Sequence, residues 1–198
     1  MKFVFPPGFN PKPTLKGDGL TLRPLNEGDV EGLYEAASDP KIWAGHPATD
    51  RYKKSVFRTY FESLLNIGGC LIAFIDGDDI PIGCSSFYTD TNANHRLSIG
   101  FTFLTVNHWG GATNRKFKRL MLNHAYRHSS EVWFHIAPSN IRSQKATKKL
   151  GAVLTHTDKL DLGGGMIDWQ CYCLTQETWK QNDATYLRKS LSSMQVHT

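Results

Sequence analysis

The chain has 198 residues, of which 40% are hydrophobic, 12% aromatic and 21% charged, a composition typical of one globular domain over residues 1–198. Its 17 glycines and 9 prolines are close to average usage, which excludes a collagen-like or low-complexity chain. The formal net charge of +5 suits an anionic ligand but does not require a nucleic acid.

The termini and the cysteines give further expectations. Residues 1–13 lack the apolar stretch of a secretory signal, and no run of 18 apolar residues occurs, so we expect a cytoplasmic protein with no membrane partner. Cys70, Cys84, Cys171 and Cys173 each lie in apolar, strand-like surroundings. A C-x-C pair without a partner pair or nearby histidines is a poor zinc signal, so we expect buried thiols and no metal.

Hydrophobic periodicity predicts a strand, two helices and a hairpin in the first half. The expected elements are a strand at 20–25, a helix that Asn26 and Asp29 cap and Pro40 ends, a helix that follows Thr49 or Asp50 and closes at Gly68-Gly69, and strands at 70–75 and 80–88. The residues between the last two strands, 76–79, are Asp-Gly-Asp-Asp, which is typical of a hairpin turn.

Strands and helices alternate in the second half. The expected elements are a strand at 96–106, a helix that begins at His108-Trp109-Gly110-Gly111, a strand at 131–137, a helix at 140–150, strands at about 153–157 and 167–174, and a polar helix or tail after Thr175. This order favours parallel pairing between the strands at 96–106 and 131–137 within a mostly antiparallel sheet. We therefore expect a mixed α/β fold with six or seven strands and helices on both faces.

A strand, a Gly-Gly turn and a helix follow one another over residues 101–123. Because Gly110 and Gly111 carry no side chain, the backbone N–H groups at the start of the helix can approach an anion. The cations just downstream would add to this attraction, and they are Arg115, Lys116, Lys118 and Arg119. The turn matches neither G-x-x-x-x-G-K-[ST] nor G-x-G-x-x-G. It predicts a pyrophosphate cradle or, on a simpler interpretation, a tight connection between a strand and a helix.

Four segments, in order along the chain, match the pattern of a known family. They are Leu22-Arg23-Pro24-Leu25 with Asp29, then Ile99-Gly100-Phe101, then His108 to Asn114 leading into Lys118-Arg119-Leu120-Met121-Leu122, and Asn140-Ile141-Arg142-Ser143 through Leu150-Gly151-Ala152. Together they resemble the Gcn5-related N-acetyltransferases over about residues 14–179, which leaves 180–198 as a C-terminal helix or tail. Within that family the chain is most similar to the bacterial ribosomal-protein N-terminal alanine and serine acetyltransferases.

The resemblance implies an acyl-CoA N-acyltransferase fold that moves an acetyl group from acetyl-CoA, a co-substrate, to a primary amine. A protein N-terminal α-amine is one candidate acceptor. In the family acetyl-CoA lies in the splay between the fourth and fifth strands. By resemblance, the residues that face its pantetheine are Phe103, Leu104 and Thr105. Those that hold its pyrophosphate are Trp109, Gly110, Gly111, Ala112, Thr113 and Asn114. Those near the pantetheine and the thioester sulfur are Asn140 and Ser143.

The roles of these residues in the chemistry follow from the same resemblance. The Ser143 hydroxyl would stabilise the leaving thiolate, although the residue also lies on the packing face of its helix. The expected partners are acetyl-CoA and an amine acceptor, with no nucleic acid and no metal, in a monomer or a homodimer. The acceptor should contact residues 41–51, the first helices and the turn at 159–165, none of which carries a diagnostic motif.

Several positions depart from the family pattern. In the turn, a gapless alignment puts Trp109, Ala112 and Asn114 where the family has Arg or Gln, Gly, and Gly or Ala. Ser98 stands where many relatives carry a carboxylate base, and Thr147 stands where other branches use a catalytic tyrosine. The sequence therefore does not identify the general base. The alternative function is a weak or inactive module that binds coenzyme A as a sensor.

The histidines and the missing base limit the chemistry. His124, on an apolar helix stripe, and His135, beside Trp133 in a strand, are expected to be structural. Three interpretations of His108 remain: it contacts a phosphate, it forms part of the substrate pocket, or it is an exposed loop residue. Only a neutral amine attacks a thioester, so a chain without a strong base favours an α-amine, with a pKa near 8, over a lysine near 10.4.

Overall fold

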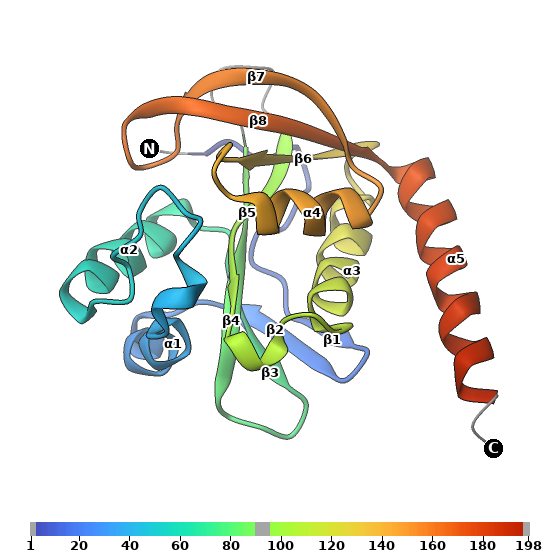
Figure 1. Ribbon diagram of the computed structural model, residues 1–198, viewed down its shortest axis with the longest axis horizontal. Helices are drawn as coiled ribbons and strands as arrows, with labels where there is room; N and C mark the ends of the chain where they lie inside the picture. The colour runs from blue at the N-terminus through green and yellow to red at the C-terminus, as the bar shows by residue number, and fades with distance from the viewer. Residues whose placement is uncertain (1–2, 90–95, 196–198) are drawn as a thin grey trace.

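The computed structural model describes residues 3–89 and 96–195, which form a twisted sheet with helices on both faces (Figure 1). Within these residues eight strands lie in the order β1-β2-β3-β4-β5-β6-β8-β7. The strands are β1 Leu15–Gly17, β2 Leu20–Pro24, β3 Cys70–Ile75, β4 Pro81–Thr89, β5 Leu97–Leu104, β6 Glu131–Ile136, β7 Val153–Asp161 and β8 Met166–Thr175. The helices are α1 Val30–Ala37, α2 Lys54–Ile67, α3 Thr113–Ala125, α4 Ile141–Lys149 and α5 Gln176–Gln195, with one-turn 3-10 helices η1 Glu27–Asp29, η2 Pro40–Ile42 and η3 Val106–His108.

The pairing of the strands confirms the predicted fold class. Each pairing is antiparallel except that of β5 with β6, which is parallel as the alternation of strands and helices predicts. The predicted count of six or seven strands is wrong, because β1 adds an eighth. This strand has three residues, of which Lys16 and Gly17 give no apolar alternation, so its pairing with β2 could not be seen in the sequence pattern.

Two helices begin later than their patterns indicate. α2 was expected directly after Thr49 or Asp50 but starts at Lys54, because residues 49–52 form turns first. α3 starts at Thr113 rather than at the glycine turn, because η3 and four bend residues, 109–112, precede it. The closing strands β7 and β8 are longer than predicted and form one extended hairpin.

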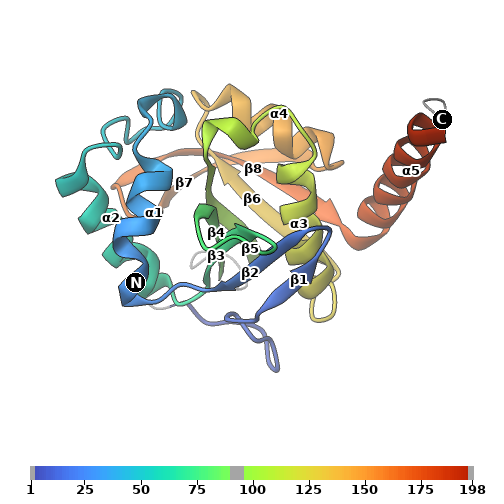
Figure 2. The ribbon, with the colours of Figure 1, turned by 90° about the horizontal axis from the view of Figure 1, so that it is seen from below.

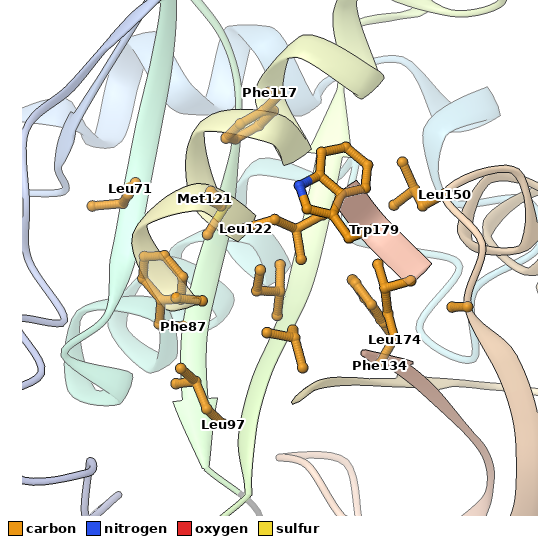
Figure 3. Packing of buried hydrophobic residues seen from close by; sticks show 14 of the residues in the cluster. Leu71, Phe87, Leu97, Phe117, Met121, Leu122, Phe134, Leu150, Leu174 and Trp179 are labelled. Carbon is orange, nitrogen blue, oxygen red and sulfur yellow. The ribbon is translucent and has the colours of Figure 1, made fainter. Parts of the chain in front are cut away.

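Each face of the sheet carries an apolar cluster. Helices α1 and α2 cover one face through side chains such as Leu33 and Phe57, and we call it the α1–α2 face. Helix α3 covers the other, the α3 face, where Phe117 and Met121 pack against the strands (Figure 3). Figure 2 shows the sheet between these two layers of helices. The cysteines are thiols as predicted, three of them buried and one half-buried: Cys70, Cys84, Cys171 and Cys173.

The polar C-terminal segment forms α5, which projects from the body of the protein (Figure 1). Its first turns are anchored, because Trp179 is buried in the cluster on the α3 face and Asp183 forms ion pairs with Arg115 and Arg119. Neither α5 nor another helix in the described residues is long and apolar enough to cross a membrane.

Candidate active site

The parallel strands β5 and β6 separate almost at once. Their register holds one pair of Cα partners, Ser98 with Trp133, whereas β4 and β5 share six pairs. Beyond this pair the strands diverge, and in Figure 1 β5 runs vertically while β6 runs across the view. The splay therefore opens between the two strands where the family resemblance expects acetyl-CoA.

A β-bulge interrupts β5 just beyond the point of divergence. One residue of β4, Ser85, faces two residues of β5, Phe101 and Thr102. Phe101 has a φ of +52°, a left-handed conformation that is rare for an aromatic residue. Because a bulge leaves an extra residue unpaired, it interrupts the regular backbone pairing of β5 beside the splay.

The Gly110-Gly111 turn presents open backbone at the start of α3. Gly110 has a φ of +74°, which favours glycine, and a Cβ at either glycine would meet no atom within 4 Å. Ala112 is the N-cap of α3, and no side chain caps the helix. The first N–H groups of this 13-residue helix and its dipole can therefore hold an anion, which is the role predicted for residues 109–114.

The side chain of Trp109 folds back from this turn onto β5. Its indole Nε1 donates a hydrogen bond of 2.9 Å to the carbonyl of Leu104. Phe103 and Leu104 are buried, whereas Thr105 is half-buried and its hydroxyl lies 2.7 Å from His108 Nδ1. A pantetheine chain along this strand would thus share the Leu104 carbonyl with Trp109. His108 is half-buried and held by Thr105 rather than lying freely in the loop.

Arg142 links the start of α4 to two other parts of the site. Its guanidinium donates hydrogen bonds to the carbonyls of Lys41, at 3.2 Å, and Ile42, at 2.6 Å. It also lies over the Trp109 ring, with 3.9 Å between Cζ and the ring centroid. The sequence indicates a solvated helix face or a phosphate contact for Arg142, and it does not reveal these contacts, because the two carbonyls lie about a hundred positions earlier. The place of Arg142 in the Asn140–Ser143 motif is the available signal.

Asn140 and Ser143 meet at the first turn of α4. The Asn140 side chain accepts a hydrogen bond of 3.2 Å from the Ser143 N–H and so caps the helix. Ser143 is half-buried. The guanidinium of Arg142, in the same turn of α4, lies over the ring of Trp109 beside the glycine turn. Asn140 and Ser143 therefore lie at the end of α4 that contacts the glycine turn.

The cations that follow the glycine turn serve the protein itself more than expected. Arg115 and Arg119 bind Asp183 at 3.2 and 3.1 Å, and Arg119 also binds Asp18 at 2.9 Å. Lys118 points into the core, where it is 6% exposed. The expectation that these cations add to the attraction of an anionic cofactor is therefore wrong for these three, because Asp183 and Asp18 pair with the two arginines and Lys118 is buried.

Lys118 lies directly behind the bulge, on the α3 face. Its Nζ donates hydrogen bonds to Thr102 Oγ1 at 2.7 Å and to Ser85 Oγ at 3.0 Å. Burial lowers the pKa of Lys118 to about 7, because the charged form loses its hydration. The signal was present in the sequence: positions 118, 121, 122 and 125 follow the helical spacing of the buried stripe.

Neither of the two positions where the family resemblance expects a proton-transfer group, Ser98 and Thr147, supplies a base. Ser98 is buried on β5 and donates to the carbonyl of Arg96 at 3.2 Å, and Thr147 is buried on α4. His124 is structural as predicted, since its Nε2 lies 2.8 Å from the Asn10 carbonyl and its ring packs against Phe9. In the part of the chain that the structure describes, no three His, Cys, Asp or Glu side chains are grouped to bind a metal ion.

The segments expected to contact the acceptor lie against the α1–α2 face. In the 41–51 segment, burial and Arg51 lower the pKa of His46 to about 4, so this imidazole is neutral at physiological pH. Arg51 stacks on Tyr60 of α2 at 3.8 Å, and the Tyr60 hydroxyl lies 3.5 Å from the carbonyl of the bulge residue Phe101. The turn at 159–165 also reaches this face, where Leu162 packs against its apolar cluster.

A sheet that opens between two parallel strands, a bulge beside the opening and an open glycine turn at a helix start define the acyl-CoA N-acyltransferase class of folds. The chain belongs to the GNAT acetyltransferase family, since the family model described as "Acetyltransferase (GNAT) domain" matches residues 19–153. No curated protein matches the chain.

Solved structures share this fold. A GCN5-related N-acetyltransferase from Brucella melitensis has a TM-score of 0.75 at 13% identity, over 93% of this chain and 88% of that chain. An acetyltransferase of the GNAT family from Bacillus anthracis has a TM-score of 0.64 at 17% identity, over 83% and 99%. Mycobacterium smegmatis RimJ in complex with CoA-disulfide has a TM-score of 0.61 at 16% identity, over 88% and 91%.

Proposed function

We propose that this protein transfers the acetyl group of acetyl-CoA to a primary amine, and that a protein N-terminal α-amine is the acceptor class to test first. The family supplies acetyl transfer as the reaction. The observation that carries the proposal is the open backbone at Gly110-Gly111, because it provides anion-binding N–H groups at the end of the splay where a pyrophosphate is needed. The likeness to RimJ, solved with a coenzyme A disulfide, supports the choice of coenzyme.

The residues around the splay suit the steps of this reaction. A backbone N–H at the Phe101-Thr102 bulge would stabilise the oxyanion as the amine attacks the thioester carbonyl. The Ser143 hydroxyl, at the first turn of α4, would donate to the sulfur as it leaves. An α-amine with a pKa near 8 is neutral in a useful fraction at physiological pH, so it needs less help than a lysine side chain.

A second function, coenzyme A binding without turnover, is favoured by one observation. By resemblance, Ser98 and Thr147 stand in place of the usual proton-transfer groups; both are buried, and a neutral hydroxyl is not a base near neutral pH. Such a protein would retain the glycine turn and the splay, and would respond to coenzyme A as a sensor.

Titration calorimetry with acetyl-CoA tests the coenzyme site. We expect Gly111→Leu to abolish binding, because its side chain would occupy the open space in front of the turn and keep the phosphates from the backbone. Gly164→Leu is the matched control: it lies in the β7–β8 turn, where a Cβ also meets no atom within 4 Å. Equal affinity in wild type and Gly111→Leu would show that the site is misplaced.

Release of coenzyme A tests the reaction. The rate of coenzyme A release is measured with two sets of peptides. The first set begins with an unblocked alanine or serine, and the second has the same sequences with an acetylated N-terminus and one lysine. We expect turnover with the unblocked peptides and much slower turnover with the lysine peptides. Binding of acetyl-CoA without release in the presence of any of these amines would establish the sensor instead.

A further inference from the structure

Tyr88 and His135 form a buried polar contact that the chemistry above leaves unused. The Tyr88 hydroxyl lies 2.6 Å from His135 Nδ1, and the two residues are 1% and 9% exposed. This is a short hydrogen bond between two groups that can each take up and release a proton. The strand pattern alone predicts a structural His135, because it does not reveal which side chain reaches it across the sheet.

The contact crosses the strand that carries the bulge. Tyr88 lies on β4 and His135 on β6, so the Tyr88 ring passes over β5, which separates them. It passes at Gly100, where a Cβ would lie 2.8 Å from Tyr88 Cε1 and 3.2 Å from its hydroxyl oxygen. The next residue is Phe101 of the bulge, whose ring packs edge-on against Tyr88 with 5.2 Å between centroids. The hydroxyl therefore lies beside the bulge.

The pair also lies where the splay begins, on the side expected for the acceptor. Ser98 is the register partner of both Tyr88 on β4 and Trp133 on β6. His135 follows Trp133 by two residues, in the direction in which β5 and β6 separate. Tyr88 belongs to the cluster on the α1–α2 face, the face reached by the 41–51 segment and the 159–165 turn. A titratable pair is thus present beside Ser98, where β5 and β6 begin to separate.

The neighbouring titratable groups leave this role to the pair. Cys84 of β4 and Tyr60 of α2 approach the carbonyl of Phe101, Cys171 of β8 is the register partner of His135, and Arg51 lies over Tyr60. Burial raises the pKa of both Cys84 and Tyr60, so both stay protonated near neutral pH. Each donates to the Phe101 carbonyl, which cannot take up a proton, whereas the Tyr88 hydroxyl lies against an imidazole that can.

We infer that the Tyr88 oxygen accepts the proton of the attacking amine, and that His135 positions the Tyr88 hydroxyl and takes up the proton of that hydroxyl. This inference rests on the proposed acetyl transfer. As the amine nitrogen bonds to the thioester carbon, its proton passes to the Tyr88 oxygen and the Tyr88 proton passes to His135 Nδ1. The C–S bond then breaks, and the thiolate takes a proton from water. His135 returns its proton to solvent through Tyr88, so one amide and one thiol are formed without a further reactant.

The experiment compares Tyr88→Phe and His135→Gln with Tyr126→Phe. Tyr126 is the matched control, because its hydroxyl is also buried and donates at 2.9 Å to the Leu174 carbonyl, a backbone partner that cannot exchange a proton. Acetyl-CoA affinity is measured by calorimetry and folding by thermal unfolding. Release of coenzyme A is measured with glycinamide as the probe amine between about pH 6 and about pH 9.

We expect Tyr88→Phe to lower kcat at least about 100-fold, the usual contribution of a positioned acid–base group, without a change in the Kd of acetyl-CoA. Tyr126→Phe should keep the wild-type kcat. His135→Gln should lower kcat less and move the midpoint of the pH profile, which the loss of a purely structural contact would not do.

The outcomes separate this inference from the proposed function. If wild type does not bind acetyl-CoA, the proposed function itself is refuted. If Tyr88→Phe binds acetyl-CoA, folds and keeps the wild-type kcat, the proton-transfer role is overturned while acetyl transfer stands. A wild type that binds acetyl-CoA but transfers nothing to glycinamide also overturns it. If Tyr88→Phe does not fold, an unmoved pH midpoint in His135→Gln decides against the role.

Discussion

Replacing Lys118 by methionine should make the protein more stable at neutral pH and reduce the pH dependence of its stability. Lys118 is a buried ammonium whose hydrogen-bond partners are two hydroxyls, Ser85 and Thr102, and burial lowers its pKa to about 7. Methionine fills a similar volume without the charge. The two hydroxyls keep a partner in the variant, since they lie 2.7 Å from each other.

The size and the sign of the effect follow from the pKa. The pKa falls from 10.5 in the unfolded chain to about 7 in the folded protein, so folding costs about 5 kcal/mol when the amine is charged in both states. This cost is fully present below about pH 7. Between the two pKa values the unfolded state binds one more proton, so stability rises with pH, by about 2 kcal/mol from pH 7 to pH 9.

Urea unfolding at pH 7, 8 and 9, followed by tryptophan fluorescence, measures this effect. We expect the stability of wild type to rise with pH relative to Lys118→Met, in which that gain is absent. Lys116→Met, on the same helix but half-buried, should behave as wild type. Because all three proteins contain the same cysteines and tyrosines, other titrations cancel in the comparison. Parallel pH profiles for wild type and Lys118→Met would refute the argument.

Three further substitutions test the geometry. Asn140→Ala should cost about 1 kcal/mol of stability by removing the cap of α4, and weaken acetyl-CoA binding in calorimetry, whereas Asn140→Asp, which keeps the cap, should be near wild type in stability. Asp183→Ala should speed hydrogen exchange in α5, because Arg119 loses its partner there; unchanged exchange would mean that the ion pair does not anchor the helix. Gly100→Ala should push the Tyr88 ring aside, since its Cβ would lie 2.8 Å away, and lower kcat more than it lowers acetyl-CoA affinity; the reverse order would contradict the placement of Tyr88.

Much of the fold could be predicted because local sequence patterns determine where many of its helices and strands begin and end. Hydrophobic spacing located α1, α4, β3 and β6 within two residues of their observed ends, and Gly68 ended α2 in a left-handed conformation as expected. The parallel pairing of β5 with β6 followed from the helix between them. β1 and the start of α2 could not be predicted, since a three-residue strand and a run of turns depend on what packs beside them.

In the candidate site, too, features set by local sequence could be predicted and features set by tertiary packing could not. The glycine turn is visible in the sequence because it needs only Gly110 and Gly111 next to each other, and the structure leaves both open at the start of α3. The destinations of the nearby cations were not visible. Arg115 and Lys118 are three residues apart on one helix, yet one pairs with Asp183 of α5 and the other enters the sheet behind the bulge.

The sequence by itself therefore determined the order of the elements apart from β1, the parallel pair and the family resemblance. Spacings of two and of three to four residues are properties of the chain alone, so no tertiary contact is needed to see them. Only the tertiary structure decided that Arg142 binds carbonyls about a hundred residues away and that Tyr88 crosses β5 to meet His135. Such contacts depend on the register and divergence of strands far apart in the chain, which no local spacing encodes.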